Sequence, residues 1–194
     1  METQKHLTGV RFWKWISSQP RDFWFYGFTF LLVIGLKLSW HHVKPTEPGI
    51  FLLPLVIVLR FFLGSPFMAR PDGYWNSTWR VLISKDCGGM NYFVIAHCLF
   101  VFLNLHRVRE ERKVRAYVFF FVTAYFLTFM ANFSRIIISV ILGRSGWFPS
   151  LLKGKVHLMF GTLIYFSFLV LGNGIVRTFC NCCLNERGDK DESN

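Results

Sequence analysis

Apolar runs alternate along the chain with short segments that hold most of its charged residues. A helix that crosses a bilayer needs about 20 mostly apolar residues. Long apolar runs occupy residues 24–40, 88–105, 116–142 and 156–176, and a shorter run occupies residues 50–63. This pattern predicts an all-α, polytopic membrane helix bundle with about five spans.

The segment 65–86 departs from this pattern. Two prolines and a glycine interrupt it, and Trp75 and Trp79 stand among charged residues. Aromatic and basic side chains gather where a membrane meets water, so we expect one interfacial segment here. Within it, residues 79–84 alternate weakly between apolar and polar positions, which favours a short extended stretch.

The composition also indicates a membrane protein. Of the 194 residues, 53% are hydrophobic and 17% are charged, whereas a soluble domain has roughly 45–50% apolar and about 25% charged residues. A soluble chain of this size would have too few polar residues to cover its apolar ones. We therefore expect one membrane domain over residues 1–194, with a basic tail at 1–23 and a polar tail at 184–194.

The net charge of +11 indicates a lipid surface rather than nucleic acid. The basic residues flank the apolar runs and do not form a stripe on a soluble face. The loop 107–115 has five basic residues in nine, which is typical of the cytoplasmic side. Five spans would place the basic tail at 1–23 on the opposite side, which the same rule disfavours. The sequence leaves the orientation of the N-terminus open.

Three reactive side chains lie at the same depth of the predicted bundle. Cys87 stands 18 residues from the basic-loop end of its run, and Arg135 and His157 stand 19 residues from the corresponding ends of theirs. At 1.5 Å per residue these separations are about 27–29 Å, and the hydrocarbon core is about 30 Å thick. All three groups are therefore predicted in one layer, opposite the basic loop.

Each of these residues also has a plain structural explanation. An isolated cysteine is commonly a small core residue, Arg135 could extend to the membrane surface, and His157 could cap its helix. Two observations favour a site. Gly88 and Gly89 follow Cys87 and permit close approach of another segment, and a charge inside an apolar run costs about 2.5–3.5 kcal/mol on insertion scales.

These residues resemble the exosortase/archaeosortase family, and most closely its compact branch, exosortase K. The resemblance covers residues 80–176, the expected catalytic core. It is carried by three motifs in the family's order, namely Cys87-Gly88-Gly89, Asn132-Phe133-Ser134-Arg135-Ile136, and His157 with Gly161.

The resemblance implies a membrane-embedded cysteine transpeptidase or protease that works without a cofactor or metal. Members cleave envelope proteins at a C-terminal sorting tail (a short motif, a transmembrane helix and a basic cluster) through a thioester acyl-enzyme. It implies a multi-pass protein of the cell membrane whose site faces outward, among membrane lipids. Cys87 would be the nucleophile, and Arg135 and His157 would complete the site.

Asn132 and Arg60 are further candidates, each with two explanations. Asn132 shares a helix face with Arg135, three residues on, so it either positions the site or packs helices together. Arg60 lies near the end of the short run 50–63, where it either binds a substrate carbonyl or carboxyl group or extends to the membrane surface.

The remaining histidines and cysteines are expected outside the site. His97 lies about 15 Å deeper than Cys87 on the same helix, so we expect it to pack helices. His41 and His42 fall in the first inter-helix loop, which five spans would place on the cytoplasmic side. The C-x-C-C cluster at 180–183 is also predicted on that side, where it is inert, lipidated or metal-binding.

Two other classes of protein compete with the enzyme. A thiol oxidoreductase usually carries a C-x-x-C pair, and Cys87 is the only thiol predicted in the outer layer. A non-catalytic scaffold or transporter subunit remains the main alternative. A transporter would be expected to hold polar groups near the middle of several helices, and only His97, with Thr123, fits that expectation.

Overall fold

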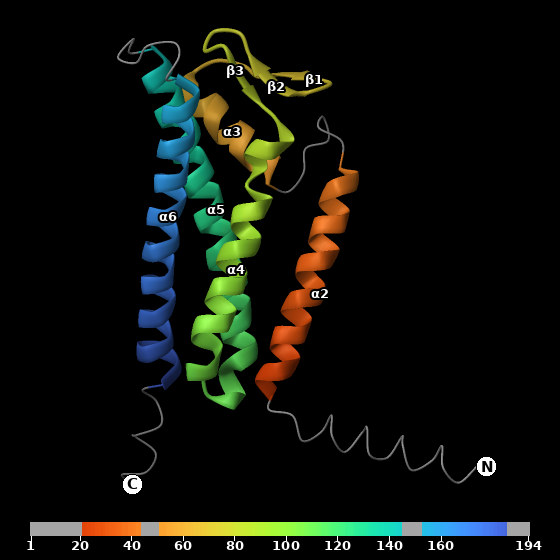
Figure 1. Cartoon of the computed structure of the whole chain (residues 1–194), viewed down its shortest axis with the longest axis vertical. Coiled ribbons are helices and arrows are strands. Elements are labelled where there is room, and N and C mark those ends of the chain that lie inside the picture. Colours follow the sequence, from red (N-terminus) through yellow and green to blue (C-terminus); the bar gives the residue numbers. More distant parts are fainter. Residues whose placement is uncertain (1–20, 44–50, 145–152, 186–194) are drawn as a thin grey trace, which may run out of the picture.

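The computed structural model describes residues 21–43, 51–144 and 153–185. Most of them form helices that run along one common direction (Figure 1). Three 3₁₀-helices lie between the longer elements, namely η1 (Lys85–Gly88), η2 (Leu105–Arg107) and η3 (Glu110–Arg112), and the π-helical segment η4 (Cys180–Asn185) follows the last helix. The long elements are α2 (Arg21–His42), α3 (Leu52–Leu63), α4 (Met90–Asn104), α5 (Lys113–Arg144) and α6 (Lys153–Phe179).

Within the described residues, four helices are long and apolar enough to cross a membrane, and α3 is not among them. Its 12 residues span about 18 Å, well short of a hydrocarbon core of about 30 Å. The helix ends where Gly64 takes up a left-handed conformation, with φ of 63°. The run 50–63 is thus apolar but shorter than a typical span, and the number of spans stays a prediction.

A small antiparallel sheet caps the end of the bundle that holds α3 (Figure 1). Gly73 has φ of 143°, and a Cβ atom there would lie 2.3 Å from the Ile83 carbonyl oxygen. The third strand confirms the extended stretch expected within 79–84, but the sheet as a whole was not predicted. Its strands, in spatial order, are β1 (Met68–Arg70), β2 (Gly73–Asn76) and β3 (Val81–Ile83).

The core lies among α4, α5 and α6. Phe93, Phe100 and Phe120 are fully buried there. Small residues let the helices approach closely, as in other membrane bundles: a Cβ atom at Gly172 would lie 2.2 Å from Leu127 Cδ1. Many large apolar side chains on the outer faces remain exposed, as expected for helices that face lipid.

Polar side chains join the helices inside this core. His97 Nε2 on α4 lies 3.1 Å from the Tyr117 hydroxyl on α5, and the Thr29 hydroxyl on α2 lies 3.1 Å from the same oxygen. Asn104 on α4 donates a hydrogen bond of 3.1 Å to Asn173 on α6. Buried hydrogen bonds of this kind hold membrane helices together. His97 therefore packs helices, as its depth predicted.

An ion pair fixes the start of α2 beside the start of α5. Lys113 Nζ lies 2.5 Å from an Asp22 carboxylate oxygen and also contacts Glu110. The basic loop at 107–115 is therefore at the same end of the bundle as the start of α2. The far end of α2, with His41 and His42, lies at the end that holds η1 and Cys87 (Figure 1). The expectation that these histidines lie opposite Cys87 is wrong, because α2 ends beside η1, where Lys85 donates to the His41 carbonyl.

Replacing Lys113 by methionine should destabilise the protein by about 1–3 kcal/mol. The side chain of Lys113 is 5% exposed and that of Asp22 is 20% exposed, so the loss should fall between the values for exposed and fully buried pairs. Thermal unfolding in detergent, followed by circular dichroism, measures the change. Arg109→Met, in the same loop but exposed, is the matched control and should shift the midpoint little.

Candidate active site

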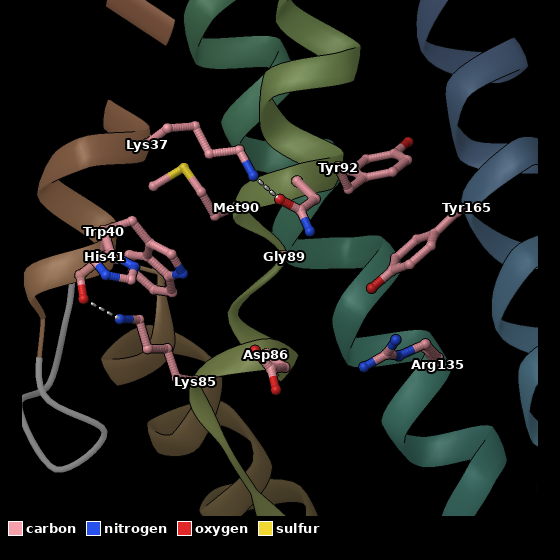
Figure 2. A pocket seen from close by; sticks show the side chains of 11 residues that line it. Lys37, Trp40, His41, Lys85, Asp86, Gly89, Met90, Tyr92, Arg135 and Tyr165 are labelled. Carbon is pink, nitrogen blue, oxygen red and sulfur yellow. Dashed lines mark hydrogen bonds between the residues drawn. The ribbon is translucent and has the colours of Figure 1, made fainter. Parts of the chain in front are cut away.

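Two cavities meet at Arg135, at the end of the bundle opposite the basic loop. We call the first, of about 650 Å³, the sheet-side cavity. It lies between β3, η1 and α5, and its lining includes Arg80, Leu82, Cys87, Arg135 and Ser139. The second, of about 560 Å³, lies between the end of α2, the start of α4, α5 and α6. We call it the α2-side cavity (Figure 2).

Cys87 is presented by the short helix η1, between β3 and α4. Its backbone N–H donates to the Ser84 carbonyl at 2.9 Å, and its Sγ lies 3.9 Å from Ser84 Oγ. The thiol is free and partly exposed, and it lines the sheet-side cavity together with Arg135. Asp86, its neighbour, lines the α2-side cavity instead. The carboxylate and the thiol therefore line different cavities.

The two glycines after Cys87 allow α4 to begin against other helices. Gly89 has φ of 76°, and a Cβ atom there would lie 1.8 Å from Asn132 Nδ2. A Cβ atom at Gly88 would lie 3.0 Å from the Trp40 ring. The close approach predicted from the paired glycines is therefore present, toward α5 and α2.

Asn132 joins α5 to α6 directly behind this turn. It is 1% exposed, its amide nitrogen donates to the Thr128 carbonyl at 2.9 Å, and its side-chain oxygen accepts from the Tyr165 hydroxyl. The helix-packing explanation offered by the sequence is confirmed, because the side chain links α5 to Tyr165 on α6. The positioning of a site by Asn132 stays a prediction.

Arg135 lies between the two cavities and contacts α6. Its guanidinium carbon is 5.3 Å from the centre of the Tyr165 ring, a cation–π contact (Figure 2). Within the described residues its buried Nε atom has no hydrogen-bond partner. A Cβ atom at Gly161 would lie 3.1 Å from Arg135 Cδ, so the glycine makes room for the arginine. The Tyr165 hydroxyl lies close enough to Arg135 and to the Cys87 thiol to interact electrostatically with both.

His157 lies in the first turns of α6, and its side chain is outside the described residues. Its backbone position is four residues before Gly161, which places both on one face of the helix.

Several side chains at this site were not singled out from the sequence. Tyr165 follows Gly161 by four residues, so helical spacing from the family motif was a signal that could have found it. Tyr92 stacks on it, with ring centres 4.9 Å apart. The others come from separate elements and carried no local signal: Lys37, Trp40, His41, Lys85 and Asn91.

Arg60 and the cluster at 180–183 are not brought to the cavities. Arg60 lies on the exposed face of α3 and lines neither of them. The segment η4 follows α6 at the basic-loop end, where the Phe179 and Phe119 rings stack. Cys180 is buried there and Cys182 is exposed. Among the residues that the structure describes, no three His, Cys, Asp or Glu side chains gather as metal ligands would.

No protein-family model, curated protein or solved structure matches the chain.

Proposed function

We propose that the protein is a membrane-embedded cysteine peptidase or transpeptidase of the exosortase type, acting on the C-terminal sorting tails of envelope proteins. One observation carries the proposal: the Cys87 thiol and the Arg135 guanidinium line a single cavity, although they are 48 positions apart in sequence. Gly161 of α6 packs against that arginine, and His157 precedes this glycine by four residues in the same helix.

The proposed orientation places this cavity on the outer side of the cell membrane. The start of α2 and the loop 107–115 share one end of the bundle, and the basic tail at 1–23 leads into that end of α2. Segments rich in lysine and arginine are retained in the cytoplasm. Four crossings thus agree with both basic segments, which five crossings could not do.

In the first proposed step, Cys87 attacks the scissile peptide. The thiolate sulfur forms a bond to the carbonyl carbon, and the π electrons of the carbonyl move onto its oxygen. The guanidinium of Arg135 donates hydrogen bonds to this oxyanion, where a site shielded from water strengthens them. The tetrahedral intermediate then expels the amine, which takes a proton from His157, and leaves a thioester on Cys87.

In the second step, water or an amine attacks the thioester carbon. The new C–O or C–N bond forms as the C–S bond breaks, and the proton of the attacking group passes to His157. Cys87 returns as a thiolate, and His157 is again protonated for the next cycle. Asn132 and Tyr165 act as positioning residues, because the tyrosine supports Arg135 through its ring and is held by the asparagine.

The decisive test is Cys87→Ala. Processing of tail-bearing envelope proteins, followed by gel mobility in cells that express each variant, should fall below detection because the alanine has no nucleophile. Wild-type protein should also form a hydroxylamine-sensitive adduct with a tail peptide, as a thioester requires, and the alanine variant should form none.

Cys98→Ser is the matched control. Cys98 is a second partly exposed thiol on α4, three turns below Cys87, and this variant should process normally. Continued processing by Cys87→Ala would remove the enzyme proposal and leave the non-catalytic scaffold or transporter subunit as the better description.

A further inference from the structure

The α2-side cavity gathers basic side chains from three separate elements. Lys37 comes from α2, Lys85 from η1 and Arg135 from α5 (Figure 2). Asp86 is the one acidic residue among the described residues that line this cavity. The described lining therefore has three fixed positive charges against one negative charge.

These positive charges are not neutralised by neighbouring carboxylates. Lys37 donates a hydrogen bond to the Asn91 side-chain oxygen, and Lys85 donates to the carbonyls of His41 and Val43, at 3.2 and 2.8 Å. Arg135 rests on the Tyr165 ring. In the parts of the chain that the structure describes, none of the three cations forms an ion pair.

The surroundings of these cations favour the binding of an anion. Trp40, Tyr92 and Tyr165 form aromatic walls, and Lys85 lies 5.6 Å from the Trp40 ring centre. Attraction between charges grows as the effective dielectric constant falls. Unpaired cations beside apolar helices are also costly, so a bound anion would offset that cost.

We propose that the α2-side cavity binds the phosphate group of an anionic ligand. A phosphate carries several oxygens around one centre, and it can accept from an arginine fork and from lysine ammonium groups at the same time. The cavity offers both kinds of donor, on separate elements, so either can meet a phosphate group that enters it. The cavity volume of about 560 Å³ leaves room for more than the phosphate itself.

This site goes beyond the proposed peptidase and does not depend on it. Cys87 does not line the α2-side cavity, so ligand binding needs no reactive thiol. Arg135 lines both cavities, which would hold the phosphate ligand next to the peptide cavity.

Binding can be measured on the full-length protein in phospholipid-free dodecyl maltoside, through the fluorescence of tryptophans that include Trp40. One arm titrates inorganic phosphate and glycerol 3-phosphate. A second arm adds dioleoylphosphatidylglycerol to the micelles and compares it with dioleoylglycerol, which has no phosphate. Saturable binding confined to the first arm identifies a soluble phosphate ester as the source. Saturation by the phospholipid but not by dioleoylglycerol identifies a lipid headgroup.

Charge removal tests the assignment of residues. Lys37→Gln and Lys85→Gln should each weaken the measured Kd about fivefold or more, since one lysine near an anionic group contributes roughly that factor. Lys37→Arg keeps the charge and should retain binding, which separates charge loss from misfolding. Arg109→Gln, at the opposite end, should bind like the wild type.

Absence of saturable binding in both arms, or equal binding by both glutamine variants and the wild type, would overturn the phosphate site. The Cys87→Ala variant separates the two proposals. It should bind phosphate normally whatever its processing activity, so a failed peptidase assay leaves this inference standing, and a failed binding assay leaves the peptidase proposal standing.

Discussion

Arg135→Gln should lower tail processing by about 100- to 1,000-fold. Loss of one preorganised donor to an oxyanion has this effect in other acyl-transfer enzymes, and glutamine brings neither the charge nor the fork of a guanidinium. The side chain sits in the wall of the sheet-side cavity that also holds the Cys87 thiol. Initial rates of processing of a purified tail-bearing substrate give the measurement.

Two further variants make this result interpretable. Arg135→Lys keeps the charge without the fork and should fall between glutamine and the wild type. Arg70→Gln removes an exposed cation of the sheet, which lies over the Trp75 ring outside both cavities, and should process at the wild-type rate. Equal rates for the folded Arg135→Gln variant and the wild type would exclude Arg135 from the reaction.

Gly89→Ala should destabilise the protein by about 2–5 kcal/mol. A left-handed backbone costs a residue with a side chain about 1–2 kcal/mol, and forcing an extra carbon into a packed site costs typically 1–3 kcal/mol. Both apply at Gly89, where φ is 76° and the new Cβ would lie 1.8 Å from Asn132 Nδ2. Thermal or denaturant unfolding in detergent measures the loss.

Gly35→Ala provides the comparison. Gly35 lies within α2, and a Cβ atom there would meet nothing within 4 Å, so alanine should be neutral or stabilise the helix by up to about 1 kcal/mol. If both alanine variants unfold alike, the close contact between the start of α4 and Asn132 does not contribute to stability in the way described.

The long helices and the depth of Arg135 could be predicted because both follow from simple spacing. A run of apolar residues fixes the existence of a helix, and the rise per residue fixes how far along it a side chain lies. The same arithmetic placed Cys87 and Arg135 at one end of the bundle, and they line one cavity. His97 followed from its depth in the same way.

The length of the helix in the run 50–63 could not be predicted because it depends on where α3 stops. The run 50–63 is as apolar as a spanning helix, but the left-handed Gly64 ends it after 12 helical residues. If one span is miscounted, the loops assigned from that count are placed on the wrong side of the membrane. His41 was therefore expected at the wrong end, and it instead lines the α2-side cavity.

The sheet and the cationic cavity could not be predicted from the sequence, for a different reason. Strands of three or four residues carry almost no periodic signal. Lys37 and Lys85 stand far apart in sequence. They line one cavity with Arg135 only because of the packing of α2, η1 and α5. The residue pattern along one segment contains no information about which residues of other segments will line the same cavity.

The short helix α3 gives the two halves of the molecule unequal cross-sections. It thickens only the end that carries the sheet and the cavities, whereas the described part of the basic-loop end consists of the longer helices and short turns (Figure 1). In a bilayer, and in the orientation proposed above, such a shape would displace more lipid from the outer leaflet than from the inner one. Membranes whose outer leaflet is stretched by convex curvature would then accommodate the protein at lower elastic cost than flat ones.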